Sequence, residues 1–145
     1  MAFDDLFRTA NISASGLAAE RMRMEVVANN IANAHSTRGP DGGPFRRQHL
    51  VFASMVDELA SNTPNGATGL RGVQVVNKLD DPSEFPRIYQ PGHPDADGEG
   101  FVAMPNVFLP MEMVDLMTAS RAYEANVKVM QMFREQMEQA LSILR

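Results

Sequence analysis

The sequence predicts an α+β fold, with long N- and C-terminal helices packed as a coiled coil and a small β-rich insert between them. Of the 10 Gly and 9 Pro in the 145 residues, every one except Gly16 lies between Gly39 and Pro110. Because both residues disfavour helix interiors, the two ends remain able to form helices. Apolar residues at both ends recur at steps of four and three, the spacing of one helix face. We therefore expect an N-terminal helix over 1–36, an insert over 37–110 and a C-terminal helix over 111–145. The segments 1–36 and 111–145 should pair as an inner core domain.

The N-terminal segment predicts one helix from Phe3 to His35. Its apolar stripe includes Phe7, with Arg21 as the charged exception. Such a helix would be about 50 Å long at a rise of 1.5 Å per residue. Gly16 costs about 1 kcal/mol in a helix interior relative to Ala, so it marks either a break or a close approach of another backbone.

The C-terminal segment has the stronger helical pattern. Its stripe runs from Leu109 to Leu144, and Pro110 suits the first turn of a helix. A second apolar stripe widens the face, and a single helical pair would leave part of both stripes exposed. We therefore expect helices of other chains to cover them.

Methionine is concentrated in this second helix, where six of the 11 Met residues lie between Met111 and Met137. The favoured interpretation is adaptable core packing, and the second is a surface that repacks against non-identical neighbours. A metal-binding methionine cluster is disfavoured because no His or Cys accompanies these residues.

The middle of the chain has the pattern of a small β unit. Partial alternation predicts a strand over Phe45–Ser54. Gly72–Leu79 is interpreted as a second strand, and Arg87–Tyr89 and Phe101–Ala103 are short candidate strands. A turn is predicted at Pro40–Pro44 before the first strand, and a polar loop over Ser61–Gly69 before the second. About 60 residues form a marginal core alone, so the insert should lean on the helices or on neighbouring chains. Arg46 and Arg47 are interpreted as a solvated strand edge, or else as a contact with an acidic partner.

The composition excludes several classes of chemistry. With no Cys, disulfides and thiolate catalysis are absent, and the net charge of −5 argues against a dedicated nucleic-acid binder. No apolar run approaches the roughly 20 residues of a membrane span. No metalloprotease, nucleophile-elbow or P-loop motif occurs, so we expect no catalytic residues, metal, cofactor or small-molecule substrate.

One acidic segment has the spacing of a partial calcium loop. Asp95, Asp97 and Glu99 alternate as calcium ligands do, but Asn106 stands where the loop requires a bidentate Glu. A hydrogen-bonded turn is the favoured interpretation.

Four motifs carry a resemblance to a known family. Residues Ala28, Asn29, Asn30, Ile31, Ala32 and Asn33 spell A-N-N-I-A-N. The others are P-G-H-P-D-A-D at 91–97, M-P-N-V at 104–107 and A-S-R-A-Y-E-A-N-V at 119–127. Over essentially its whole length the chain resembles the flagellar rod and hook proteins, and within them the proximal rod proteins of the bacterial flagellar basal body.

The resemblance implies a structural, non-enzymatic subunit. It would be exported by the flagellar type III secretion system without a cleaved signal peptide. In the periplasm it would assemble helically into the rod that transmits motor torque. Expected partners are other copies of itself, other proximal and distal rod proteins, the ring-to-rod adaptor and the export apparatus.

Carried onto this sequence, the resemblance also implies a subunit interface. Asn29, Asn30 and Asn33 should hydrogen-bond within or between subunits. The expected packing residues are Leu17, Met24, Val27, Ile31, Met113, Leu116, Tyr123, Val127, Met130 and Leu141.

Two other classes of function compete with a structural subunit. The alternative is a small soluble adaptor or cap associated with secretion, working as a monomer or dimer in the cytoplasm. An enzyme such as a peptidoglycan hydrolase is disfavoured, because no acid pair or His-rich site can be identified.

Overall fold

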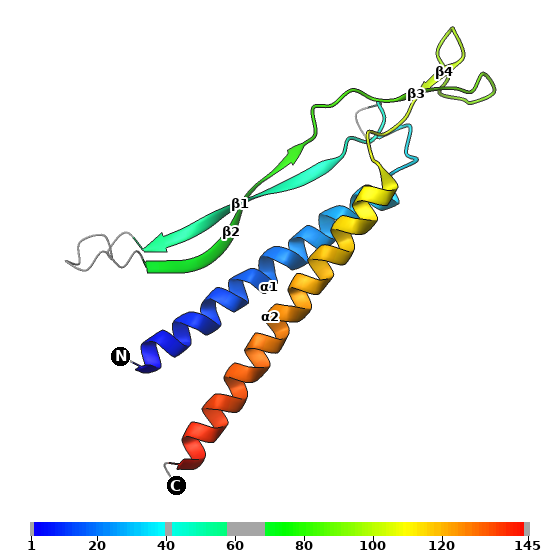
Figure 1. Cartoon of the computed structure of the whole chain (residues 1–145). Helices are drawn as coiled ribbons and strands as arrows, with labels where there is room; N and C mark the ends of the chain where they lie inside the picture. Colours follow the sequence, from blue (N-terminus) through cyan, green and yellow to red (C-terminus); the bar gives the residue numbers. More distant parts are fainter. Residues whose placement is uncertain (1, 40–41, 58–68, 144–145) are drawn as a thin grey trace. The chain divides into compact units, whose positions relative to one another are not determined.

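The computed structural model describes residues 2–39, 42–57 and 69–143. The elements follow in the order α1 (Ala2–Ala32), β1 (Gln48–Asp57), β2 (Gly69–Asp80), β3 (Arg87–Tyr89), β4 (Phe101–Ala103) and α2 (Leu109–Ile143) (Figure 1). Two terminal helices and two strand pairs confirm the α+β class. Residues 40–41 of the predicted turn and 61–68 of the predicted loop lie outside the described residues.

The predicted element boundaries need small corrections. Strands β3 and β4 have the predicted bounds, but β1 begins at Gln48 instead of Phe45. The reason lies in the backbone partners, since the Phe45 N–H donates to the Ser36 carbonyl and the Arg47 N–H donates to the Asn106 side chain. Because these groups are occupied elsewhere, the strand cannot start earlier.

The chain divides into two compact units, and each is described by itself. The first unit comprises Met1–Met22, Val51–Asn77 and Ala119–Arg145, and the second comprises Arg23–Leu50 and Lys78–Thr118. Each unit therefore takes part of α1, part of α2 and part of the paired strands β1 and β2.

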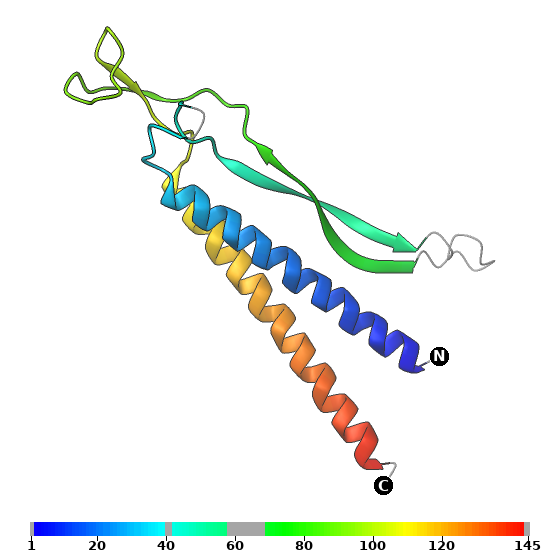
Figure 2. The ribbon, with the colours of Figure 1, turned by 180° about the vertical axis from the view of Figure 1, so that it is seen from behind.

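In the first unit, the early part of α1 contacts both α2 and β2. The rings of Phe7 and Phe133 meet edge to face with centroids 6.2 Å apart. On the strand side, the Ser15 hydroxyl accepts a hydrogen bond from the Val73 N–H at 3.1 Å, so the part of β2 in this unit contacts the early part of α1 (Figure 2).

Helix α1 continues through Gly16, so a break there is the wrong interpretation. A Cβ atom at this position would lie 3.1 Å from Nδ2 of Asn126 on α2. The glycine therefore accommodates a close approach, and the neighbour is a side chain instead of a backbone.

In the second unit, β3 and β4 form a short antiparallel pair in which Ile88 lies opposite Val102. Val102 is buried, whereas all three residues of β3 are exposed. Outside this pair the buried side chains include Val27 and Ala34, together with two polar residues, Asn30 and Glu112. Polar groups thus make up a large share of a small core, which makes their hydrogen bonds important.

Candidate functional site

The predicted packing residues differ widely in exposure within the single chain. Val27 is buried, and seven others are half-buried, namely Leu17, Met24, Ile31, Leu116, Tyr123, Val127 and Met130. Met113 and Leu141 are 58% and 63% exposed. The half-buried residues already have neighbours in their own chain, so the two exposed ones are the most direct candidates for contact with another chain.

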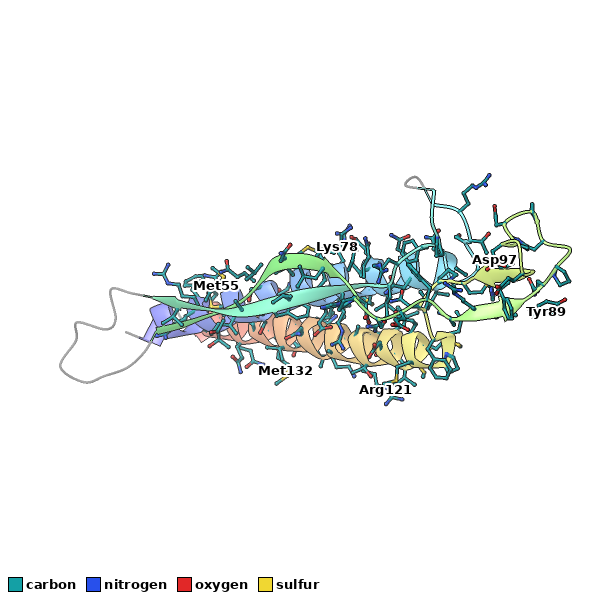
Figure 3. All side chains as sticks on the ribbon, turned by 90° about the horizontal axis from the view of Figure 1, so that it is seen from above. Met55, Lys78, Tyr89, Asp97, Arg121 and Met132 are labelled. Atoms are coloured by element: carbon teal, nitrogen blue, oxygen red, sulfur yellow. The ribbon has the colours of Figure 1, made fainter. Side chains whose placement is uncertain are left out.

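More apolar side chains at α2 are exposed than the interface prediction named. Five further side chains have at least half of their surface exposed, namely Phe108, Met111, Val114, Met117 and Met132. Of the six methionines between Met111 and Met137, only Met130 and Met137 are half-buried, so the core-packing interpretation fails for the other four. The methionine count was the signal that could have identified this surface. In Figure 3, Arg121 and Met132 extend from the same side of α2.

The asparagines of the A-N-N-I-A-N motif hydrogen-bond inside the chain. Nδ2 of Asn33 donates to the carbonyl and to Oδ1 of Asn29, one helical turn earlier, at 2.9 and 2.7 Å. Oδ1 of Asn33 in turn accepts from the Ser36 hydroxyl at 3.1 Å. Asn29 and Asn33 thus supply hydrogen bonds at the end of α1 and in the turn that follows it. The backbone groups at a helix end lack helical partners, so such side-chain bonds stabilise it.

Asn30 belongs to a buried polar cluster in the second unit. We define the Glu112 cluster as Asn30, Arg47, the backbone of Gln48, Asn106 and Glu112. Glu112 is 0% exposed and Asn30 is 1% exposed. Oε2 of Glu112 accepts from Nδ2 of Asn30 at 3.0 Å, and Oε1 accepts from Nε of Arg47 at 2.6 Å. Each carboxylate oxygen therefore has its own donor.

Three carboxylates lie close to the Arg47 guanidinium. Besides Glu112, its guanidinium lies 3.5 Å from Oδ2 of Asp115 and 3.6 Å from Oδ2 of Asp81. Partial burial lowers the pKa of Arg47, but the hydrogen bond to Glu112 and the three negative charges raise it above its ordinary value overall. The pKa of Asp81 is lowered, first by hydrogen bonds from the Ser83 hydroxyl and N–H and also by the charge of Arg47. Glu112 is thus paired and hydrogen-bonded, as a buried charge requires.

The solvated-edge interpretation of Arg46 and Arg47 is wrong. Arg46 donates to the carbonyls of Asp81 and Ser83 at 2.7 and 3.0 Å, and its guanidinium lies 4.2 Å from the centre of the Phe85 ring. Sequence reasoning missed these partners because the contacts join positions 34 to 68 residues apart, from Arg47–Asp81 to Arg47–Asp115, with no spacing rule to reveal them.

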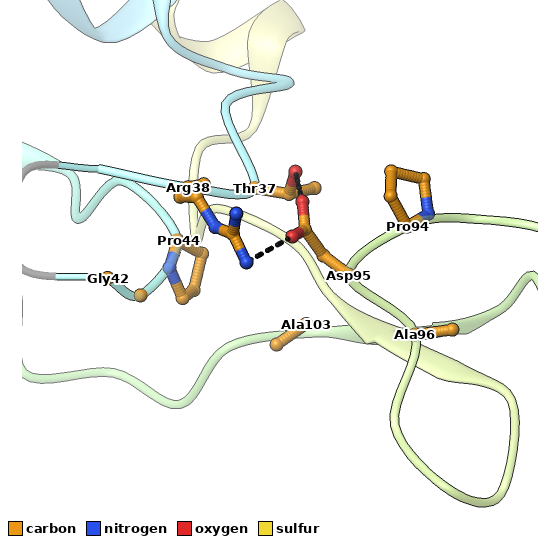
Figure 4. A pocket seen from close by; sticks show the side chains of 9 residues that line it. Thr37, Arg38, Gly42, Pro44, Pro94, Asp95, Ala96 and Ala103 are labelled. Atoms are coloured by element: carbon orange, nitrogen blue, oxygen red, sulfur yellow. Dashed lines mark hydrogen bonds and ion pairs between the residues drawn. The ribbon is translucent and has the colours of Figure 1, made fainter.

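The acidic segment at 95–99 forms turns, as the favoured interpretation held. The Asp95 carboxylate accepts from the Thr37 hydroxyl and pairs with Arg38 at 3.1 Å, beside a hollow of about 380 Å³ (Figure 4). Oδ1 of Asp97 accepts from the N–H groups of Glu99 and Phe101 at 2.9 and 2.8 Å. These bonds lower the pKa of Asp97, that from Phe101 most of all.

The described ranges contain neither a metal-binding cluster nor a membrane-spanning helix. Nowhere in them do three His, Cys, Asp or Glu side chains gather as a metal ion would require. Among the helices that the structure places, none combines the length and apolar character needed to cross a membrane.

Comparison with known proteins gives a consistent family. A model for the "Flagella basal body rod protein" family matches residues 11–40, and one for the C-terminal region of the "Flagellar basal body rod FlgEFG protein" family matches residues 99–143. Asn30 lies in the first matched segment and Glu112 in the second. The Glu112 cluster therefore joins the two.

Relatives from distant bacteria match nearly the full length. The flagellar basal-body rod protein FlgC of Borreliella burgdorferi is 42% identical, covering 97% of this chain and 98% of its own. The FlgC proteins of Salmonella typhimurium and Bacillus subtilis are 41% and 38% identical, covering 95% and 94% of this chain and 97% of their own. The chain therefore belongs to the FlgC family of flagellar basal-body rod proteins, and it is a structural component of the bacterial flagellum, not an enzyme.

Proposed function

We propose that this chain is a proximal rod subunit that assembles helically through its two terminal helices. The observation that carries the proposal is the exposed apolar surface at the start of α2. Phe108, Met111, Met113, Val114 and Met117 are each at least half exposed within ten residues. Contiguous apolar surface of this kind typically marks an interaction site.

Burial of these side chains would supply the driving force for assembly. Each square ångström of apolar surface removed from water contributes about 25 cal/mol, so five large side chains add up to several kcal/mol. Glu112 lies among them in sequence but is buried, so it does not add charge to the surface. Methionine side chains adapt to differently shaped neighbours, which suits a subunit that contacts both its own copies and other rod proteins.

The finer architecture of the assembly rests on the resemblance to flagellar rod and hook proteins. We infer that 1–36 and 111–145 pair as a coiled coil, and that these helices form the inner wall of a tube with the insert outside it. Packing residues would include Met113 and Leu141, the two predicted interface residues that are exposed. Torque would then pass between subunits through interlocked helices.

The remaining expectations belong to the same proposal. The chain would leave the cytoplasm through the flagellar type III secretion system without a cleaved signal peptide. It would assemble in the periplasm with other proximal and distal rod proteins and the ring-to-rod adaptor. A cytoplasmic adaptor or cap is the alternative, and it would be absent from purified basal bodies.

The experiment is a charge substitution at the two exposed positions in the native bacterium. Met113→Asp and Leu141→Asp should abolish swimming in soft agar and remove the rod from purified basal bodies, while subunit synthesis stays normal. Because both side chains are largely exposed in the single chain, the substitutions should leave its fold intact. Gln90→Asp is the matched control, since it adds the same charge at an exposed position in the insert. Wild-type motility and rod recovery in Met113→Asp would rule out the start of α2 as an assembly interface, and the same result in Leu141→Asp would rule out its end.

A further inference from the structure

The Asn30 side chain imitates a neighbouring β-strand at the start of β1. Oδ1 of Asn30 accepts from the Gln48 N–H at 3.0 Å, and Nδ2 donates to the Gln48 carbonyl at 2.8 Å. A paired strand makes the same two-point contact with the backbone of a single residue. The first residue of β1 is therefore held by a side chain from α1.

This contact requires one orientation of the Asn30 amide. If the amide turned over, its NH₂ group would face the Gln48 N–H and its oxygen would face the Gln48 carbonyl. Glu112 determines the orientation because an ionised carboxylate only accepts hydrogen bonds, and its Oε2 atom lies 3.0 Å from Nδ2 of Asn30. The second hydrogen of the same NH₂ group then points at the Gln48 carbonyl.

The backbone N–H of the preceding residue, Arg47, has a partner that does not contact Glu112, although the Arg47 side chain does. The Arg47 N–H donates to Oδ1 of Asn106 at 2.7 Å, and Nδ2 of Asn106 donates to the Ser83 hydroxyl at 2.9 Å. Two successive backbone N–H groups thus have separate asparagine partners. Only the partner of Gln48 is oriented by the buried carboxylate.

We propose that Glu112 is a positioning residue that acts through Asn30 to fix the beginning of β1. The role goes beyond rod assembly, because it concerns how each subunit holds its own strand. Arg47 completes the arrangement by occupying the other carboxylate oxygen at 2.6 Å, so that Oε2 remains directed at Asn30. The pairing joins positions 82 residues apart, so the start of β1 is not fixed until the chain as far as α2 is in place.

The test is amide hydrogen exchange of the full-length chain, resolved for Gln48 and Arg47 by nuclear magnetic resonance. Asn30 and Arg47 donate to different oxygens of the Glu112 carboxylate. In Glu112→Gln only one of these two positions is an oxygen, so the side chain can accept from Asn30 or from Arg47 but not from both. Exchange at Gln48 should therefore rise at least about tenfold, given the strength of hydrogen bonds to charged groups. Exchange at Arg47 should rise much less than at Gln48, because the hydrogen bond from the Arg47 N–H to Asn106 is left intact. Glu99→Gln, at an exposed position in the same unit, is the matched control and should change neither.

A double-substitution cycle separates positioning from general destabilisation. Asn30→Ala should release Gln48 by itself, and adding Glu112→Gln to it should produce no further rise at Gln48. The proposal is overturned by additive effects, by an equal rise at Arg47 and Gln48, or by a Gln48 amide that is already unprotected in the parent chain. Since no readout involves motility or assembly, failure here is distinguishable from failure of the rod interface.

Discussion

The Ser15 hydroxyl joins α1 to β2 by accepting a hydrogen bond from the Val73 N–H at 3.1 Å, across 58 positions of the sequence. The same hydroxyl donates to the Ile12 carbonyl at 2.7 Å, so both of its hydrogen-bonding roles are used. Gly72, the residue before Val73, has a φ of +121° and lies against Ser15. The strand can approach the helix this closely only because position 72 has no side chain.

Replacement of Gly72 by Ala should therefore destabilise the chain strongly. The new Cβ would overlap Ser15, and the positive φ adds a backbone penalty of about 1–3 kcal/mol. We expect a loss of at least about 2 kcal/mol in the free energy of unfolding measured with urea. Gly42→Ala should cost only about 1 kcal/mol, because Gly42 has a φ of +81° but open space around it. Gly92→Ala has neither feature, and a loss as large as that of Gly72→Ala would contradict the explanation.

The Gly16 position should respond to a second substitution on the facing helix. Alanine at this position gains about 1 kcal/mol of helix propensity, but its Cβ would lie 3.1 Å from Nδ2 of Asn126. Asn126 is held by its bond to the Ala122 carbonyl at 3.1 Å, so it yields poorly. Gly16→Ala alone should be neutral or destabilising, whereas Gly16→Ala in an Asn126→Ala background should stabilise by about 1 kcal/mol. Thermal unfolding of the four chains in this cycle measures the coupling, and strict additivity would show that the two positions do not touch.

Local patterns predicted the elements of this fold, and long-range contacts decided the rest. The distribution of Gly and Pro located both helices, and local residue type located the short strands β3 and β4 at their actual bounds, because both signals depend on neighbours in sequence. The start of β1 was misplaced because it depends on the side chains of Asn30 and Asn106, which lie far away in sequence. Propensity and periodicity contain no information on such partners.

The predicted interface residues and the Glu112 cluster also depend on contacts that are distant in sequence. The interface implied by the resemblance included Met113 and Leu141, which are exposed, but it did not distinguish them from Val27, which is buried in its own chain. The sequence gives no sign that Glu112 is buried, since a Glu in the first turn of a helix is ordinarily a solvated residue that interacts with the helix dipole. Only the arrangement of Asn30 and Arg47 around it reveals that it is buried and paired.

The turn at Asp97 should lose its order in acid. Its pKa is lowered by hydrogen bonds from the backbone, that from Phe101 being the largest cause. Because the pKa is lowered in the folded state, the ionised Asp97 carboxylate stabilises the turn fully at any pH above the ordinary pKa of Asp. This stabilisation is lost as the pH falls below about 4 and through the lowered pKa. Amide exchange at Glu99 and Phe101, followed from pH 6 to pH 2.5, should accelerate in that range beyond the intrinsic pH dependence. Asp97→Asn retains an acceptor oxygen without a titrating proton, so the extra acceleration should disappear, and its persistence would assign the effect to another group.

Arg47→Lys should show that the shape of the guanidinium matters as well as its charge. Arg47 reaches Glu112 through Nε, Asp115 through Nη2 and Asp81 through Nη1, a set that a single ammonium cannot cover. The Lys variant keeps the charge but leaves the buried Glu112 carboxylate with a poorer partner, so urea unfolding should reveal a loss of about 1–3 kcal/mol. Arg87→Lys is the matched control, since Arg87 is exposed on β3 and should change the free energy of unfolding by less than about 0.5 kcal/mol. Equal stability of the two variants would mean that Glu112 needs only a nearby positive charge and not the directed hydrogen bond from Nε.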